Sequence, residues 1–180
     1  MYFSHFPVIR YDSVGDGESK VVTHLLKRVA IHGKANSVSS LYDTYDVRNG
    51  ETPEMISHKY YGDAEYHWVI LMVNNITDRY HQWPMNTRQF LAHLTGRYDN
   101  VDATHHYEIN QVSGDTDVKI NIGLTNIDVN GDTISDATLI TNREYEEEKQ
   151  DVIRKIRLLD PEYLEQFVEE FERLVSETED

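Results

Sequence analysis

Residues 42–75 read "YDTYDVRNGETPEMISHKYYGDAEYHWVILMVNN" and carry the clearest structural signals in this sequence. Tyr45 and Val47 alternate with polar neighbours, which is the pattern of a half-buried β-strand. Asn49 and Gly50 follow them, and this pair is typical of a turn. The stretch is therefore expected to begin with a strand that ends in a tight turn.

Two short helices are expected after that turn. Thr52 is a good N-cap, Pro53 fits the first helical position, and Gly62 fits the left-handed residue that ends a helix. Asp63 can then cap a second helix that turns Trp68 inward. Together with the Trp-Pro corner that follows, this segment is predicted to bury Tyr45, Val47, Met55, Ile56, Tyr60, Trp68, Leu71 and Trp83.

A further short helix is expected after the corner Trp83-Pro84. Its sequence "TRQFLAHL" has apolar side chains at helical spacing, so Phe90, Leu91 and Leu94 are predicted to face inward.

Residues 105–140 change to β structure. The runs "HHYEINQV", "DVKINIGL" and "TNIDV" alternate with period two and are separated by "SGD" and "NGD". Both separators are strong hairpin signals, and Asn130-Gly131 fits a type I′ turn. The region is expected to form a small antiparallel sheet or β-arm.

Residues 141–180 are expected to be helical. Thr141 and Glu144 match a capping box, which opens a helix predicted to bury Tyr145, Val152, Ile153 and Ile156. Asp160-Pro161 supplies a new N-cap and first-turn proline, so a second helix is expected to begin there.

Both ends of the chain are rich in large apolar side chains, and two interpretations of them are open. The ends can pack on the chain's own core, or they can pack on partner proteins in a complex. The presence of two such ends in one chain favours assembly. The predicted protein interface comprises Phe3, Phe6, Pro7, Tyr163, Leu164, Phe167 and Phe171.

Composition excludes several functional classes. The chain has 180 residues, a formal net charge of −15 and no cysteine. This charge repels phosphates, so nucleic acid and an anionic membrane surface are not expected as partners. No segment approaches the roughly 20 apolar residues that span a bilayer. No export signal is recognised in "MYFSHFPVIRYD", so a soluble protein is expected.

No catalytic motif stands out. The sequence lacks G-x-S-x-G, a P-loop and G-x-G-x-x-G. Pairs of carboxylates, which glycosidases use, are uninformative here because 32 acidic residues make such pairs unavoidable. The protein is therefore predicted not to be an enzyme and to bind no cofactor.

A metal site is not predicted either. His105 and His106 are adjacent on an expected strand, so their side chains should point to opposite faces and should not share an ion easily. "DVNGDTISD" resembles the start of a calcium loop, but Thr133 and Leu139 stand where such a loop needs glycine and a bidentate carboxylate. A hairpin is favoured there over a calcium site.

The segment "YDVRNGETPEMISHKYYGDAEYHWVILMVNN" resembles a LysM module. The resemblance implies a strand, two helices and a binding site for peptidoglycan or chitin between the strand–helix loops. A LysM module closes with a second strand shortly after the final Asn. Here "ITDRYHQWPMNTRQFLAHLTGRY" follows instead, so carbohydrate binding is the alternative function rather than the favoured one.

Nearly the whole chain resembles one further family. The stretches "YFSHFPVIRYD", "GETPEMISHKYYGDAEYHWVILMVNNITDRYHQWPM" and "TNREYEEEKQDVIRKIRLLDPEYLEQFVEEFERLV" occur in the order found in a baseplate wedge subunit of T-even-type contractile-tailed phages, the gene fifty-three product family. The Trp-Pro corner and "RLLDP" are the most specific motifs of this resemblance.

This resemblance implies a structural role. Such a subunit docks on the helical core of the wedge, contacts the adjoining wedge, helps to join wedges around the central hub and lies near the sheath-initiator subunit. It is part of the virion and is assembled in the host cytoplasm.

The sequence thus predicts an α+β protein with a LysM-like module, a small antiparallel β-arm and C-terminal amphipathic helices. Its expected segments are an N-terminal docking segment, the LysM-like module with the next helix, the hairpin region and the C-terminal helices, at residues 1–41, 42–98, 99–140 and 141–180. Its predicted function is assembly of a phage tail baseplate.

Overall fold

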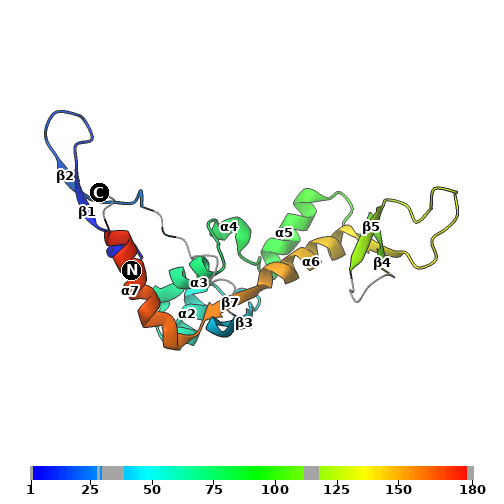
Figure 1. Cartoon of the computed structure of the whole chain (residues 1–180). Helices are drawn as coiled ribbons and strands as arrows, with labels where there is room; N and C mark the ends of the chain where they lie inside the picture. The colour runs from blue at the N-terminus through cyan, green and yellow to red at the C-terminus, as the bar shows by residue number, and fades with distance from the viewer. Residues whose placement is uncertain (1, 28, 30–38, 112–117, 178–180) are drawn as a thin grey trace. The chain divides into compact units, whose positions relative to one another are not determined.

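A computed structural model describes residues 2–27, 29, 39–111 and 118–177 of the chain (Figure 1). The fold is α+β, as predicted, with small antiparallel sheets and a C-terminal helix. Two compact units are present: unit 1 consists of residues 1–83 and 155–180, and unit 2 of residues 84–154. The predicted "SGD" turn lies outside the described residues.

Unit 1 is organised by a two-stranded sheet whose strands are far apart in the sequence. β3 (Tyr42–Asp46) pairs antiparallel with β7 (Lys155–Leu159) along the full length of both strands. Figure 1 shows the two strands side by side, one drawn in the early colours of the chain and the other in the late ones. α2 (Pro53–Tyr61) and α3 (His67–Val73) follow β3 and pack against each other.

The helix boundaries in unit 1 lie where the sequence predicts them. The Thr52 hydroxyl accepts a hydrogen bond from the Met55 amide at 3.4 Å, and Gly62 ends α2 with φ of 81°. Asp63 caps a short 3-10 turn, η3 (Ala64–Tyr66), that leads into α3. Gly62 suits this position because a side chain strains a residue with positive φ.

The helix expected over residues 141–156 is shorter than predicted. α6 (Asn142–Arg154) ends before Lys155, and Ile156 is buried in β7 rather than on a helix face. Val152 is 68% exposed, so the prediction that it is buried is wrong. The reason is a change of period: in "KIRLL", Ile156 and Leu158 alternate with basic residues, which suits a strand buried on one face.

Asn74, at the end of α3, fastens this helix to β7. Its side-chain amide donates to the Arg157 carbonyl at 2.7 Å, and its side-chain oxygen accepts from the Arg157 amide at 2.8 Å. The side chain thereby satisfies both backbone groups of one strand residue. Asn74 therefore connects the end of α3 to the last strand of unit 1.

The core of unit 1 contains most of the predicted residues. Val47, Ile56, Trp68 and Trp83 are buried, and Tyr45, Tyr60 and Leu71 are partly buried against the core. The prediction is wrong for Met55, which is 59% exposed. Met55 directly precedes Ile56, and consecutive helical residues point in different directions, so the face that buries Ile56 leaves Met55 outside.

The other described elements of unit 1 come from both ends of the chain and from the segment after α3. They are η1 (Tyr2–His5), β1 (Val8–Tyr11), β2 (Lys20–Thr23), η2 (Ser39–Leu41), α4 (Arg79–Gln82), η4 (Pro161–Tyr163) and α7 (Leu164–Ser176). β1 and β2 form an antiparallel two-stranded ribbon. Asp160 caps η4 as expected, and α7 continues directly from it.

Unit 2 contains a three-stranded antiparallel sheet and two helices. β4 (Thr104–Asn110) lies between β5 (Lys119–Gly123) and β6 (Thr138–Thr141). α5 (Thr87–Arg97) and α6 both begin with the reciprocal hydrogen bonds of a capping box. The predicted pairing of the first two runs is confirmed, whereas the third strand is β6 and not "TNIDV".

Two smaller predictions for unit 2 are corrected. Leu91 is exposed, whereas Leu94 on the same helix is buried. The "NGD" turn is not type I′, because Gly131 has a positive φ of 90° and Asn130 does not. The Gly131 amide instead bonds to the Asp128 carbonyl at 3.1 Å, as in a type I turn followed by a left-handed glycine.

None of the described helices is both long enough and apolar enough to cross a membrane.

The assignment of β7 predicts opposite outcomes for two nearby substitutions. Leu158→Ala removes a side chain with 0% exposure and is expected to lower the free energy of unfolding by about 2–5 kcal/mol. Val152→Ala removes an exposed side chain of the same class and is expected to change it by less than about 0.5 kcal/mol. Urea unfolding of both variants measures the difference. A larger loss in the free energy of unfolding for Val152→Ala than for Leu158→Ala would contradict the boundary between α6 and β7.

Candidate functional site

The two ends of the chain meet in unit 1 around an aromatic cluster. The ring of Phe171 on α7 lies 4.6 Å from that of Trp68 on α3, measured between centroids. Tyr2 and Phe6 pack on the same two elements, with their centroids 5.7 and 6.1 Å from that of Phe171. Aromatic pairs at these separations add to the stabilisation from burial alone. The N-terminal segment is therefore joined to α7 by the chain's own core.

Polar contacts accompany this aromatic cluster. The His5 Nδ1 atom lies 2.6 Å from a carboxylate oxygen of Glu172 on α7, and the His5 ring also lies edge-on to Phe171. The Lys27 ammonium group donates a hydrogen bond to the Glu177 carbonyl at the end of α7. His5 precedes β1 in the chain and Lys27 follows β2. These two contacts therefore hold the base of the ribbon β1–β2 next to α7.

The structure divides the predicted interface residues into two groups. Phe6 and Phe171 are buried in the core of unit 1, so a contact of these two side chains with a partner would require the core to open. Phe3 is 56% exposed and Tyr163 is also exposed. Pro7, Leu164 and Phe167 are partly buried, and the last two pack against the core. Contact of the exposed residues with a partner stays a prediction.

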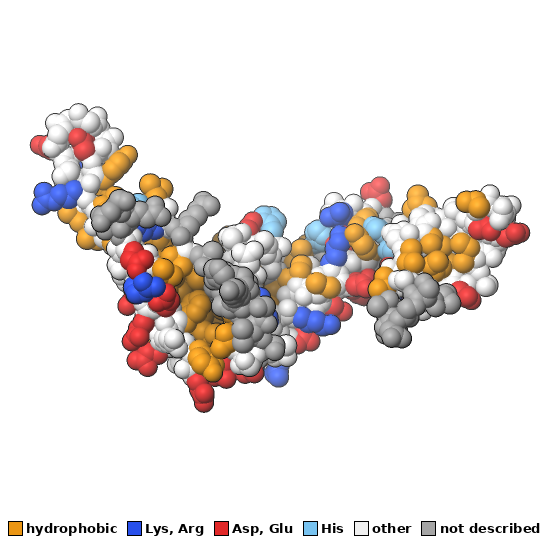
Figure 2. Space-filling model, viewed as in Figure 1, with side chains coloured by type: hydrophobic (Ala, Val, Ile, Leu, Met, Phe, Trp, Pro, Cys, Tyr) orange, Lys and Arg blue, Asp and Glu red, His pale blue; other side chains and the backbone are white. Residues whose placement is uncertain are grey.

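An additional apolar surface lies on the ribbon and was not predicted as an interface. Its exposed large side chains are Val8 and Val21 on one face of the ribbon and Tyr11 and Val22 on the other. A two-stranded ribbon is marginally stable by itself, because neither face is covered. Figure 2 shows hydrophobic side chains along the ribbon. The sequence did indicate this surface through the high density of apolar residues between positions 2 and 11. Only Phe3, Phe6 and Pro7 of that segment were predicted to contact a partner.

The outer face of α7 is charged. Arg173 binds Glu170, with a shortest nitrogen–oxygen distance of 2.5 Å, and also binds Glu177. The hydrogen bond from Arg173 lowers the pKa of Glu170. Such exposed pairs contribute little to stability. α7 is therefore an amphipathic helix whose apolar side joins the core and whose outer side is acidic.

The segment after α3 covers the turn between β3 and α2. The Trp83 indole nitrogen donates to the Glu51 carbonyl at 2.9 Å, and Arg79 binds Glu54 with nitrogen–oxygen distances of 2.6 and 3.1 Å. Ile76 packs against the same core cluster as Trp83. The loop next to the expected sugar groove is thus contacted by the chain itself. The LysM likeness stays a prediction: a strand does pair with β3, but it is β7, which follows residues 84–154 rather than coming shortly after Asn75.

In unit 2, the two adjacent histidines do not point to opposite faces as predicted. The Nδ1 atoms of His105 and His106 lie 2.8 Å apart, and His106 Nε2 lies 2.8 Å from a Glu108 oxygen. The cause is an irregular register of β4 against β6 between Thr104 and His106, because a bulge breaks the alternation of side chains. Burial and the neighbouring His106 lower the pKa of His105, whose ring stacks on Tyr145.

These histidines do not extend into a set of three metal ligands. Among the described residues, no group of three or more His, Asp or Glu side chains is placed to hold a metal ion. At the former calcium-loop candidate, the Asp128 carboxylate accepts hydrogen bonds from the Asn130 and Asp132 amides at 2.8 and 2.9 Å. These bonds lower the pKa of Asp128 and stabilise the turn.

A buried carboxylate connects the helices of unit 2. Glu146 on α6 accepts a hydrogen bond from the Tyr98 hydroxyl at 2.9 Å, and nitrogen atoms of Arg97 and Lys149 lie 3.5 Å from the same oxygen. Burial opposes ionisation of this group, but the Tyr98 hydrogen bond and the two cations outweigh it and lower the pKa of Glu146. The ionised side chain therefore stabilises the folded unit.

A family model described as base plate wedge protein 53 matches residues 1–172 of the chain. A comparison with curated proteins found no match. Because the family model covers almost the entire sequence, the chain belongs to this family of phage baseplate structural proteins.

The lowered pKa of Glu146 predicts a pH-dependent contribution to stability. Because the pKa is lower in the folded state, the contribution is complete above the ordinary Glu pKa of about 4.3 and is lost as pH falls through the folded value. Glu146→Gln is therefore expected to destabilise the protein at pH 7 and to have a smaller effect at pH 4. Thermal unfolding at both pH values measures this.

The exposed Glu148, on the same helix, provides the control. Glu148→Gln is expected to change the free energy of unfolding by less than about 0.5 kcal/mol at either pH. An effect of Glu146→Gln that is equal at pH 7 and pH 4 would contradict the proposed role of its charge.

Proposed function

We propose that this member of the base plate wedge protein 53 family joins wedges to each other and to the central hub during assembly of a contractile-tail baseplate. The observation that carries the proposal is the family match over residues 1–172. We further propose that it acts as a binding subunit without enzymatic activity. Its partners would be the helical core of the wedge, the adjoining wedge and the sheath-initiator subunit, and its assembly would take place in the host cytoplasm.

The N-terminal surface of unit 1 is the part best suited to such contacts. We define this docking surface by the exposed residues Phe3, Val8, Tyr11, Val21 and Val22. Apolar residues gathered on one exposed element commonly mark a protein interface. A partner that covers the ribbon would also supply the packing that a two-stranded hairpin lacks. The aromatic cluster beneath the ribbon would transmit this contact to the core of unit 1.

Carbohydrate binding is the second candidate function, and one observation argues against it. The contact of the Trp83 indole with the Glu51 carbonyl places a bulky side chain against the loop where the LysM likeness implies a sugar groove. Stacked aromatic rings and free backbone groups would be needed there for a polysaccharide. We therefore assign the strand–helix part of unit 1 to holding the docking surface rather than to binding sugar.

The docking surface predicts which substitutions disrupt assembly. Phe3→Asp combined with Tyr11→Asp places two charges on exposed positions, so the chain is expected to fold normally. Binding to wedge partners from the same phage is expected to weaken at least about tenfold, because a few central apolar residues usually dominate an interface. Co-purification followed by titration in an interaction assay measures the loss.

A matched control introduces the same charge elsewhere. Tyr80→Asp combined with Val129→Asp alters two residues that are exposed but lie outside the docking surface. This variant is expected to bind wedge partners like the unmodified chain. Equal binding by both double variants would exclude the docking surface, and absence of binding by the unmodified chain would contradict the assembly function.

The carbohydrate alternative is tested with bacterial sacculi. The unmodified chain is expected to remain in the supernatant after centrifugation with peptidoglycan, whereas a functional LysM domain used as the control sediments with it. Sedimentation of this chain that soluble chitin oligosaccharides reverse would support sugar binding and contradict the assignment made here.

A further inference from the structure

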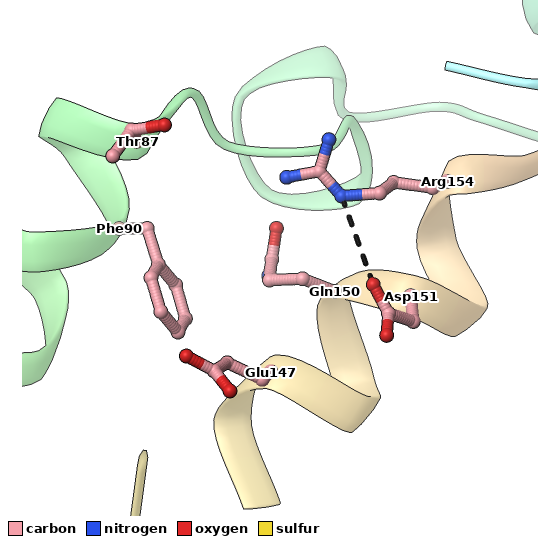
Figure 3. Close-up of a pocket in the computed structure, with 6 residues that line it drawn as sticks. All are labelled: Thr87, Phe90, Glu147, Gln150, Asp151 and Arg154. Atoms are coloured by element: carbon pink, nitrogen blue, oxygen red, sulfur yellow. Dashed lines mark ion pairs between the residues drawn. The ribbon is translucent and has the colours of Figure 1, made fainter. Parts of the chain in front are cut away.

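Two helices of unit 2, α5 and α6, line an open cavity that none of the preceding functions uses. It has a volume of about 240 Å³ and is lined by Thr87, Phe90, Glu147, Gln150, Asp151 and Arg154 (Figure 3). Pockets for drug-sized ligands typically measure about 300–1,000 Å³. The volume therefore suits a single long side chain better than a cofactor or an oligosaccharide.

The chemistry of the cavity favours a cation. Glu147 and Asp151, one turn apart on α6, both belong to its lining and are exposed to solvent. Glu147 has no ion-pair partner among the described residues, and the Asp151 carboxylate is only in loose contact with Arg154, at 4.0 Å. The partly buried Phe90 adds an aromatic wall, and aromatic faces attract cations.

Gln150 adds a directed hydrogen-bond donor. Its side chain oxygen accepts from the Met85 amide at 2.9 Å, which fixes the orientation of the amide group. Gln150 is only 7% exposed, and its side chain nitrogen donates to none of the described residues. Figure 3 shows this side chain between Phe90 and Arg154. This nitrogen is not among the fully buried unsatisfied atoms of the described residues, so it is accessible from the cavity, and the acceptor of a ligand can bind it.

The cation in the lining, Arg154, is fixed at the edge of the cavity by a contact with the backbone. Arg154 donates to the Met85 carbonyl at 3.3 Å, next to the amide that binds Gln150. The loop at Met85 therefore restrains both side chains. A second cation can then approach Glu147 and Asp151 from the solvent side.

We propose that this cavity binds an arginine side chain of a partner protein. A guanidinium group can stack on Phe90 while it binds the carboxylates of Glu147 and Asp151, and its planar shape suits both contacts better than an ammonium group does. A backbone carbonyl of the same segment would accept the hydrogen bond from Gln150. The net charge of −15 attracts basic segments to this chain. That the partner is a baseplate subunit rests on the proposed function.

The test is a titration of the full-length chain, followed by NMR. The probe is the peptide acetyl-Gly-Arg-Gly-amide, and the same peptide with citrulline in place of arginine serves as the neutral isostere. Saturable shifts of the Gln150 side chain amide and of the Phe90 backbone amide are expected with the arginine peptide only. Free arginine is titrated as well, and it is expected to bind more weakly because it lacks the peptide carbonyls.

Variants separate the cavity from general attraction to an acidic protein. Glu147→Gln combined with Asp151→Asn is expected to weaken binding of the arginine peptide by about fivefold or more. Glu148→Gln combined with Glu165→Gln changes the net charge equally, outside the cavity, and is expected to leave the dissociation constant within about twofold.

Three results would overturn the proposal: no saturable shift with the arginine peptide, equal binding of the citrulline peptide, or equal weakening of binding by the two double variants. Tighter binding of free arginine than of the peptide would overturn the assignment to a protein partner. The peptide titration does not depend on baseplate assembly. A negative titration would therefore contradict only the proposed arginine site, whereas absence of binding to wedge partners would contradict the proposed function.

Discussion

The pairing of β3 with β7 is the constraint on which the rest of the structure depends. It joins strands that are far apart in the sequence, and the whole of unit 2 lies between them along the chain. The cost of closing so long a connection grows only slowly with its length, so a large insertion is compatible with a stable sheet. Burial of Ile156 and Leu158, together with the hydrogen bonds between Asn74 and Arg157, offsets that cost.

The same pairing places the ends of the chain. α7 begins shortly after β7, so its apolar face is brought to α3, where Phe171 packs on Trp68. The N-terminal segment then completes this cluster through Tyr2 and Phe6. What remains exposed is the ribbon β1–β2 and the acidic outer side of α7. The core thus explains why only part of the apolar material at the chain ends is available to partners.

Local signals were predicted well from the sequence, and features that depend on distant residues were not. Thr52 and Gly62 act within one helical turn, so their roles could be recognised without a structure. The strand at Ile156 follows a helix directly and its partner is remote, so the short alternation of Ile156 and Leu158 was not enough to separate it from the helix before it. His105 and His106 lie together because of a bulge, which is a property of pairing with β6. For the interface, the apolar ends were recognised, but which side chains the core would bury could not be.

Belonging to the base plate wedge protein 53 family gives these surfaces a context in which an assembly role is expected. The most direct measurement is an electron cryo-microscopy map of the assembled tail baseplate at side-chain resolution. We predict that a neighbouring subunit covers the ribbon β1–β2 at Tyr11 and Val22, while β3 stays paired with β7. A map in which the ribbon faces solvent, with no neighbouring protein against it, would contradict this prediction.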